Sequence, residues 1–438
     1  MNQVIEFIHE LTWEALPEAV RSQARRCLLD TLGTAIGGRS TDCSQIIHEH
    51  AAAVFGGKGA TLWQDGREVS PAGAALANGM TIDSLDIHDG YKLCKGHPGA
   101  AIVPASFATL SLASGEMIDG KELLTTLVVG YEVALRAGVA LHSTACDFHS
   151  SGAWNALGCA ALTARRLSLD PEQTRQALGI AEYHGPRSQI MRVVDYPTMV
   201  KDGSGWGAMA GVSAGLLAKA SFSGAPALTV EMEPVSTYWD DLGQTWRMLD
   251  LYFKPYAVCY WAQPAIAGVL TLQQRHQIDP AAIRRIGVHT FHQATRLKVT
   301  HPTSTDEAQY SLPFPVAAAL IHHRLGPEEL DGRTLQDPRV LALAERVDLI
   351  EEKAFNEKFP AQRFARVEIE LENGERYDSG EVTARWEPSA PPSDEELIEK
   401  FRWLAGIRLS PTECAALEKM IWDCAELEDV SPLADALK

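Results

Sequence analysis

The sequence is short of basic residues. It has 39 Lys and Arg residues against 57 Asp and Glu residues, which gives a formal net charge of −18. A surface this acidic repels nucleic acid and anionic membranes, so we expect neither as a partner. It also repels an anionic substrate at long range. A site for such a substrate would therefore have to supply its own local positive charge.

Other absences narrow the class of protein further. The eight cysteines form no CxxC pair and no Cys/His spacing typical of a zinc site. Residues Met1 to Glu10 lack the basic start and apolar stretch of a signal peptide. No apolar run reaches the ~18 residues needed to span a bilayer. We therefore expect a cytoplasmic protein with free thiols, without a membrane partner.

Apolar periodicity predicts a mainly helical protein in the first part of the chain. Apolar positions with helical spacing predict helices over residues 16–38, 98–114, 119–142, 152–167, 171–182 and 207–220. Several of these segments are rich in Ala, Gly and Ser, and small residues let helices approach closely. A chain of 438 residues is also long enough for two domains.

The pattern changes to a mixed α+β unit after about Ile278. Alternating apolar residues predict strands over 285–291, 366–371 and 375–382, with a helix over 314–322 between the first two. Asn373-Gly374 is typical of a hairpin turn. Residues 388–392 form a proline-rich linker, and Ser393 with Glu396 then predicts a capping box that begins a further helix.

Chemically active side chains concentrate between Asp83 and Gly99. This segment contains three aspartates, two histidines and two lysines, and its last residues precede a predicted helix. Free N–H groups at a helix start attract anions and disfavour a protonated histidine. His97 is therefore suited to act as a general base near neutral pH. The alternative is a polar surface loop with solvated charges.

Three later segments carry further candidates. Residues 147–152 supply His149, although a lone loop histidine is commonly an ordinary polar residue. Residues 199–208 combine Lys201 with several glycines at a helix start, an arrangement that can hold a carboxylate. They are not a dinucleotide loop or a P-loop, because no clear strand precedes them and GK[ST] is missing. Residues 254–261 lie where the helical and mixed parts meet, and ligand sites favour such junctions. The alternative for this last segment is a buried aromatic seam.

These motifs resemble those of the MmgE/PrpD family, and the resemblance covers essentially the whole chain. The most specific pieces are LDIHDG with KGHPGA, MVKDGSGWGAMAG and FKPYAVCYW. The family includes 2-methylcitrate dehydratases, cis-aconitate decarboxylases and an iminodisuccinate epimerase. The resemblance implies a large helical domain built from residues 1–264 and 391–438, plus an α+β lid domain over residues 265–390. It also implies a homodimer that needs no metal and no organic cofactor.

The resemblance assigns roles to individual residues by motif match. The implied catalytic residues are Asp86, His97, His149 and Lys201. The implied substrate-binding residues are Asp89, Lys95, Lys254, Cys259 and Tyr310. This chain departs from the family at two places that concern the acid for a leaving group. Cys259 stands where some members carry a histidine, and a tyrosine of some members aligns with Phe314, one turn after Tyr310.

The expected reaction begins with proton removal beside a carboxylate of a small anionic polycarboxylate. His97 or His149 would be the base, and lysines and helix-start N–H groups would stabilise the resulting aci-carboxylate. Loss of hydroxide gives a 2-methylcitrate dehydratase-like lyase, which we expect first. Reprotonation from the other face gives an iminodisuccinate-type epimerase, and loss of CO2 gives a cis-aconitate-type decarboxylase.

Two further classes of protein are compatible with these residues. The first is a metal-dependent hydrolase, in which five residues would ligate a divalent ion: Asp83, Asp86, His88, Asp89 and His97. The second is a non-catalytic helical binding protein, in which the clustered titratable groups are structural.

Overall fold

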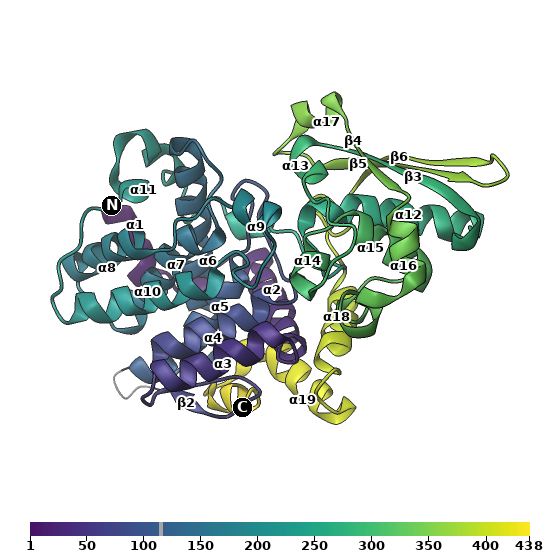
Figure 1. Cartoon of the computed structure of the whole chain (residues 1–438). Helices are drawn as coiled ribbons and strands as arrows, with labels where there is room; N and C mark the ends of the chain where they lie inside the picture. Colours follow the sequence, from purple (N-terminus) through teal and green to yellow (C-terminus); the bar gives the residue numbers. More distant parts are fainter. Residues whose placement is uncertain (114–116) are drawn as a thin grey trace.

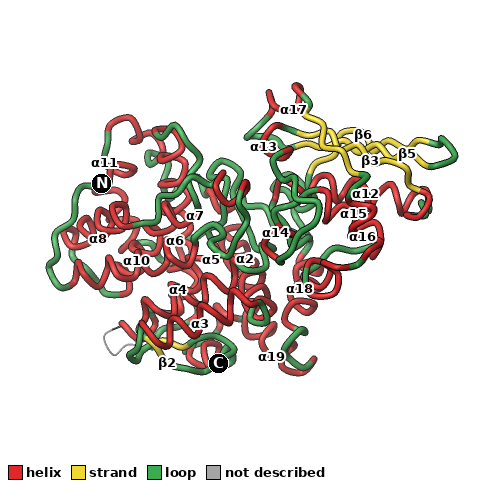
Figure 2. Tube along the Cα trace, viewed as in Figure 1, coloured by secondary structure: helices red, strands yellow, loops and turns green. Residues whose placement is uncertain are grey.

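The structure, a computed structural model, describes residues 1–113 and 117–438. It is mainly helical, with one larger sheet confined to one side of the molecule (Figures 1 and 2). Figure 1 shows both chain ends on the helical part, with the α+β part at the upper right. The predicted fold class, a large helical domain formed by both ends of the chain and a smaller α+β domain, is confirmed.

The helical domain takes most of its elements from the first part of the chain. They are α1 (Asn2–Glu10), α2 (Glu18–Gly38), α3 (Asp42–Val54), α4 (Pro71–Asp83), α5 (Gly99–Ala108), α6 (Gly120–Thr144), α7 (Ser151–Arg166), α8 (Pro171–His184), α9 (Met191–Asp195), α10 (Ser204–Lys219) and α11 (Leu228–Glu231), with a short hairpin of β1 (Ala60–Thr61) and β2 (Glu68–Val69). One core of buried apolar side chains runs through these elements, except α9, and through residues 397–437. The buried valines of α9 pack in the core of the α+β domain. The domain boundaries inferred from the resemblance stay a prediction.

The C-terminal helices return to the helical domain. They are α18 (Asp394–Ala405), α19 (Pro411–Trp422) and α20 (Ser431–Asp435), and α18 packs against α2. The predicted capping box is confirmed, because Ser393 Oγ accepts from the Glu396 N–H at 3.2 Å and Glu396 Oε2 accepts from the Ser393 N–H at 2.9 Å. Reciprocal capping fixes where this return helix begins.

The α+β domain is built on a sheet of four strands. Its elements are α12 (Gln263–His276), β3 (Ile283–Thr290), α13 (His292–Thr295), α14 (Thr305–Gln309), α15 (Pro313–His322), α16 (Pro338–Ala344), β4 (Val347–Glu351), α17 (Lys353–Lys358), β5 (Phe364–Leu371) and β6 (Arg376–Thr383). The strand order is β4-β3-β5-β6, with β3 and β4 parallel and the other pairs antiparallel. Alternate residues of β5, from Ala365 to Leu371, are buried, and α12 packs against β5 and β6.

Most predicted elements are present with shifted ends, and the exceptions have a physical cause. The helix predicted over 98–114 ends at Ala108 as α5, and Ser114 lies outside the described residues. Helix α4 was not predicted. Its residues from Gly73 to Asp83 are all buried, so it has no polar face and no amphipathic period.

Helix α6 is long and apolar enough, by length and composition, to cross a membrane. In this structure 94% of its most apolar window is buried inside the protein. Its Glu132 and Arg136 form a buried ion pair at 3.4 Å. Burial at the centre of the helical domain therefore accounts for its apolar composition.

Close helix crossings at glycine hold α4, α5 and α10 together. A Cβ atom at Gly79 of α4 would lie 2.7 Å from the Cα of Gly205 in α10 and 2.8 Å from the carbonyl oxygen of Ala100 in α5. These atoms belong to the backbone, so they cannot move aside as a flexible side chain would. The helix starts that carry the site described below depend on this contact.

Replacing Gly79 with alanine should lower the free energy of unfolding by about 1–3 kcal/mol, the usual cost of overpacking. The higher helix propensity of alanine, about 1 kcal/mol, offsets only part of this loss. Urea unfolding followed by circular dichroism measures the difference. Gly56→Ala is the matched control, because nothing lies within 4 Å of a Cβ at that position. Equal stability of the two variants would contradict the close-contact explanation.

Candidate active site

The predicted site residues meet at the seam between the two domains. Leu85 and Ile87 pack into the core of the α+β domain, and Asp86 lies between them. Asp86 has a left-handed backbone with φ of +48°, a conformation that aspartate tolerates better than most residues. Lys254 is fully buried and donates a hydrogen bond to Asp86 Oδ1. The two charges thus neutralise each other away from water.

The starts of three helices converge on His97. The His97 N–H, just before α5, donates to Ser151 Oγ at the start of α7 at 2.9 Å. Ser151 Oγ in turn donates to Asp202 Oδ2 at 2.7 Å, and the Asp202 carbonyl accepts from the Gly152 N–H at 3.1 Å. Asp202 precedes α10, so the positive ends of all three helix dipoles point toward one region. Such a region favours a bound anion.

The hydrogen bonds of His97 fix its tautomer. Its Nδ1 lies 2.6 Å from the carbonyl oxygen of Asp89. A carbonyl oxygen only accepts, so Nδ1 carries the hydrogen and Nε2 keeps a free lone pair. Nε2 lies 3.8 Å from both Asp86 Oδ1 and Asp202 Oδ2. Neither distance is a hydrogen bond, so the lone pair is available to a substrate proton.

Burial keeps His97 neutral. Removal from water, followed by the positive charge of Lys254, holds the pKa of His97 well below its usual range. The sequence predicted the direction of this shift from the helix start, but desolvation is the largest cause. A neutral imidazole with an exposed lone pair is the form that a general base requires.

The same burial raises the pKa of nearby carboxyl groups. The pKa of Asp202 is raised mainly by desolvation and further by the negative charges of Asp83 and Asp86. Desolvation also raises the pKa of Asp83, although the N–H of Ser204 donates to its Oδ2 at 3.1 Å. Asp202 therefore tends to hold a proton beside a histidine that tends to lose one.

Lys201 connects the helical domain to the α+β domain. Its Nζ lies 2.9 Å from Asp306 Oδ1, donates to Gln309 Oε1, and lies 5.5 Å from the centre of the Tyr310 ring. These three partners belong to α14 or follow it directly. The backbone of Lys201 is left-handed, with φ of +47°. A strained conformation of this kind costs about 1–3 kcal/mol and is typical of functional sites.

Tyr310, and not Phe314, lies beside Lys201. Phe314 is fully buried in the apolar core of the α+β domain. The motif alignment had placed a family tyrosine on Phe314. In the structure, Tyr310, one turn before Phe314, lies beside Lys201. A phenol group is therefore present next to the lysine although position 314 is a phenylalanine.

Asp89 hydrogen-bonds within the protein, and the Cys259 thiol stays protonated. Asp89 Oδ2 accepts from the Tyr131 hydroxyl at 2.7 Å and its Oδ1 accepts from the Gly99 N–H at 3.0 Å. Burial raises the pKa of Asp89 to about 7. With both oxygens occupied, Asp89 positions the His97 loop. At Cys259, burial raises the pKa of the thiol to about 12, so the thiol stays protonated.

His149 makes its contacts outside the cluster. Its backbone N–H donates to His142 Nε2 at 3.0 Å, and its segment pairs with Gln189. Among the described residues, no hydrogen bond or ion pair links His149 to His97, Asp86 or Lys201. Of the two histidines predicted as bases, the geometry favours His97.

Sequence reasoning missed several residues of the cluster. Asp202 and Ser151 stand next to predicted residues in recognised motifs, so their position was a usable signal. Asp306 and Gln309 come from a segment without a motif, and only the fold brings them to Lys201. His88 was considered only as a metal ligand. Its ring lies 4.7 Å from that of His97, and both its nitrogens are buried without a hydrogen-bond partner.

The acidic residues do not form a metal site. Within residues 1–113 and 117–438, no group of three or more His, Cys, Asp or Glu side chains is arranged to hold a metal ion. The Asp86 carboxylate accepts a hydrogen bond from Lys254, and the Asp89 carboxylate accepts hydrogen bonds from the Tyr131 hydroxyl and the Gly99 N–H. The five residues of the hydrolase alternative therefore do not converge as a ligand set.

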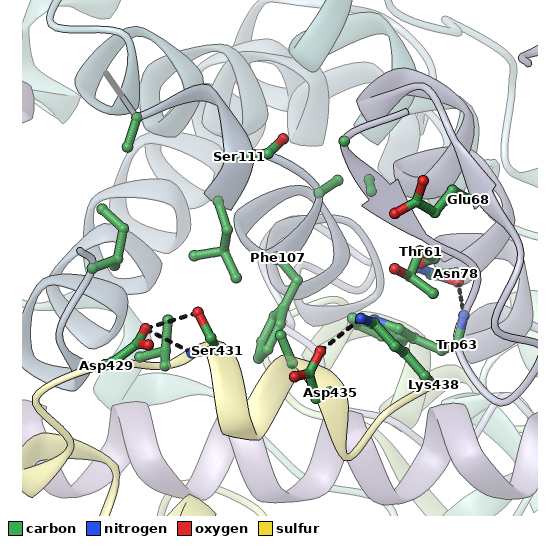
Figure 3. A pocket seen from close by; sticks show the side chains of 18 of the residues that line it. Thr61, Trp63, Glu68, Asn78, Phe107, Ser111, Asp429, Ser431, Asp435 and Lys438 are labelled. Atoms are coloured by element: carbon green, nitrogen blue, oxygen red, sulfur yellow. Dashed lines mark hydrogen bonds and ion pairs between the residues drawn. The ribbon is translucent and has the colours of Figure 1, made fainter. Parts of the chain in front are cut away.

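A separate pocket lies away from this cluster, on the helical domain. Its volume is about 590 Å³, and α20 forms one wall, where Lys438 pairs with Asp435 at 2.6 Å (Figure 3). Its lining contains none of the predicted site residues. A second pocket of about 430 Å³ is lined by Ser84 and Asp306, which contact Gln309 and Lys201. This second pocket adjoins the cluster and offers an approach to it.

Replacing His97 with asparagine should lower kcat by about 10²- to 10⁴-fold, the usual contribution of a general base. Asparagine can still donate to the Asp89 carbonyl but cannot accept the proton. Because the pKa of His97 lies below its usual value of 6.5, the base is neutral at neutral pH. The acid limb of kcat/KM should therefore fall below pH 6.5. His276→Asn, at an exposed position, is the control, and an unchanged kcat in His97→Asn would remove His97 from the mechanism.

Comparisons with known proteins find relatives over nearly the whole chain. The cis-aconitate decarboxylase of Aspergillus terreus is 23% identical, over 100% of this chain and 95% of its own length. The human cis-aconitate decarboxylase is 26% identical over 98% of this chain and 93% of its own length. The 2-methylcitrate dehydratase of Escherichia coli K12 is 23% identical over 92% of this chain and 89% of its own length. Sequence models described as the MmgE/PrpD N-terminal domain and the MmgE/PrpD C-terminal domain match residues 2–234 and 256–426. The chain therefore belongs to the MmgE/PrpD family.

Proposed function

We propose that this protein is a lyase that removes a proton alpha to a carboxylate of a small polycarboxylate and then expels hydroxide, as a 2-methylcitrate dehydratase-like enzyme. The observation that carries the proposal is the His97 ring. Its Nδ1–H is fixed on a carbonyl and its free Nε2 lies 3.8 Å from the carboxyl group of Asp202. A neutral base thus stands beside a carboxyl group that tends to be protonated. Relatives named as dehydratase and decarboxylase support the lyase class.

The first step is proton transfer from carbon to His97 Nε2. The electron pair of the broken C–H bond moves into the adjacent carboxylate, which becomes an aci-carboxylate. Lys201 and Lys254 stabilise this charge, and they do so strongly because the site excludes water. Lys201 is paired with Asp306 in the structure. A substrate carboxylate would share or replace that partner.

The second step is loss of the hydroxyl group from the neighbouring carbon. Protonated Asp202 donates its proton to the leaving oxygen, so that water departs and a C=C bond forms. His97 is then an imidazolium and Asp202 a carboxylate. The released water can carry the proton from His97 Nε2 back to Asp202 Oδ2, which lie 3.8 Å apart. The cycle closes with no change in either residue.

Decarboxylation is the second candidate. The relatives named cis-aconitate decarboxylase are as similar to this chain as the relatives named 2-methylcitrate dehydratase, at 23–26% against 23% identity. The same lysines would then stabilise the carbanion left by CO2. An epimerase would return the proton to the opposite face of the same carbon.

A substrate panel in D2O tests the proposal. Purified protein is incubated with 2-methylcitrate, citrate, cis-aconitate and iminodisuccinate, and NMR follows each. We expect loss of the hydroxy acid and new signals of the unsaturated product, an olefinic C–H from citrate or a methyl group on a double bond from 2-methylcitrate. Deuterium exchange without net reaction indicates epimerisation, and CO2 release indicates decarboxylation. Activity lost on EDTA dialysis and restored by a divalent ion would overturn the proposal in favour of a hydrolase.

We also propose that the enzyme acts in the cytoplasm as a homodimer on its small anionic substrate, without nucleic acid or membrane partners. The net charge of −18 supports the last two points. An exposed apolar patch supports the dimer. Ile46, Met199, Val200 and Trp206 line one shallow pocket and are 58%, 38%, 62% and 39% exposed. A patch of this kind is typical of an interface between proteins.

Replacing Lys201 with methionine should weaken binding of the transition state by roughly 2–5 kcal/mol, the usual cost of removing one partner of a buried charge pair. This loss appears as a lower kcat/KM. Lys201→Arg should restore activity only in part, because a guanidinium is larger and differently shaped. Steady-state kinetics on the substrate identified by the panel measure both.

Lys219→Met is the control for Lys201→Met, because Lys219 lies exposed at the end of α10, the helix that the Lys201 loop precedes. Lys201→Met leaves the buried Asp306 without its partner. The double variant with Asp306→Asn separates loss of binding from loss of folding. Kinetic constants within about twofold of wild type would exclude Lys201 as a carboxylate anchor.

A further inference from the structure

One buried cation lacks a counter-ion. The buried cationic side chains of the described residues are Arg136, Arg166, Lys201, Lys254, Arg363 and Lys400. Five of them lie in ion pairs with carboxylates. Arg363, which is 1% exposed, has no ion-pair partner among the residues that the structure describes. Buried charges are normally paired, so this exception calls for a functional explanation.

The surroundings of Arg363 satisfy only part of its guanidinium. One Nη donates to the carbonyl oxygen of Lys92 at 3.0 Å, and the Nε is buried without a hydrogen-bond partner. The group lies 4.9 Å from the ring centre of Tyr260 and 5.8 Å from that of Phe359. Glu387 does not neutralise it, because its two oxygens bind Lys92 Nζ and the Tyr260 hydroxyl, each at 2.8 Å.

A second cation without a carboxylate partner stands nearby. Lys95 is half-buried, its Nζ donates only to the carbonyl oxygen of Leu93 at 3.0 Å, and it lies 4.5 Å from the ring centre of Phe148. Burial lowers the pKa of Lys95, and the positive charge of Arg363 lowers it further, because the two cations repel each other. Phe148 and Phe359 are in contact at 6.1 Å between ring centres. Lys95 and Arg363 therefore lie beside the same pair of aromatic rings, Phe148 and Phe359.

This pair of cations adjoins the catalytic histidine. Tyr260 stacks on Tyr252 at 3.7 Å between ring centres, and Tyr252 meets the edge of the His97 ring at 6.2 Å. Lys95 is two residues before His97. Arg363 comes from the α+β domain and Lys95 from the helical domain, so an anion bound between them would bridge the seam.

We propose that Arg363 and Lys95 form an anion subsite at the domain seam that binds a carboxylate of the polycarboxylate, remote from the carbon that His97 deprotonates. The choice of ligand rests on the proposed function. A guanidinium presents paired donors that match a carboxylate, and a lysine adds a point charge. In a chain with a net charge of −18, two neighbouring cations without counter-ions are a local source of attraction. The carboxylate belongs either to the reacting molecule or to a second bound anion.

Binding of unreactive acids tests the subsite without turnover. Tricarballylate has three carboxylates and no hydroxyl group to lose, and succinate has two carboxylates. Isothermal titration compares wild type, Arg363→Met, Arg363→Lys and Lys95→Met, with Arg376→Met as the control at an exposed arginine of β6. We expect Arg363→Met to raise the Kd of tricarballylate by about 10- to 100-fold, the usual effect of losing a hydrogen bond to a charged group. The Kd of succinate should change by less than about twofold.

The stoichiometry distinguishes the two sources of the carboxylate. One tricarballylate per chain with a weakened Kd assigns the subsite to the reacting molecule. Two per chain in wild type and one in Arg363→Met assigns it to a separate anion. An unchanged Kd and stoichiometry in Arg363→Met and Lys95→Met would overturn the proposal. These measurements are independent of the substrate panel, so failure of the proposed reaction would not imitate failure of the subsite.

Thermal unfolding supplies a readout that a merely structural arginine would not give. Removal of an unpaired buried charge should raise the Tm of Arg363→Met above wild type in the absence of anions. Tricarballylate should raise the Tm of wild type and of Arg376→Met, but raise that of Arg363→Met much less. A lowered Tm in Arg363→Met with an unchanged response to tricarballylate would show that Arg363 only packs between its aromatic neighbours, and would contradict the proposal.

Discussion

The Lys201–Asp306 ion pair joins the two domains at a place that water barely reaches. Both residues are buried, and their charges lie 2.9 Å apart. Breaking a buried pair by removing one partner costs about 3–5 kcal/mol, so such a pair holds its chain segments firmly in place. Lys254 with Asp86 repeats the arrangement beside it. The left-handed backbones of Lys201 and Asp86 persist because these partners hold them.

The same exclusion of water sets the protonation of the reacting groups. Burial disfavours whichever form is charged. It therefore lowers the pKa of His97 and raises the pKa of Asp202, two groups 3.8 Å apart. One physical cause thus favours a neutral imidazole beside a protonated carboxyl group at neutral pH. No special hydrogen bond is needed to separate their roles.

The packing of small residues in the helical domain places these groups. Glycines let α4, α5 and α10 approach until backbone meets backbone. The starts of α5, α7 and α10 then come close enough for Ser151 to bridge His97 and Asp202. In the α+β domain, α14 ends at Gln309 and Tyr310 follows it, and both residues lie beside Lys201. The site is therefore a product of both domains, and neither contains it alone.

The sequence by itself determined the fold class, most of the longer helices and the loops that carry Asp86, His97 and Lys201, because periodicity and short motifs are local properties. It could not reveal α4, whose residues are buried on all sides and show no amphipathic period. It gave the helix start as the reason for a low pKa of His97, where burial is the larger cause. Only the tertiary structure decided that Asp89 accepts from Tyr131, that the His149 N–H donates to His142, and that Asp306 and Gln309 reach Lys201. Desolvation and contacts between distant segments depend on how the whole chain packs, and no local pattern in the sequence records them.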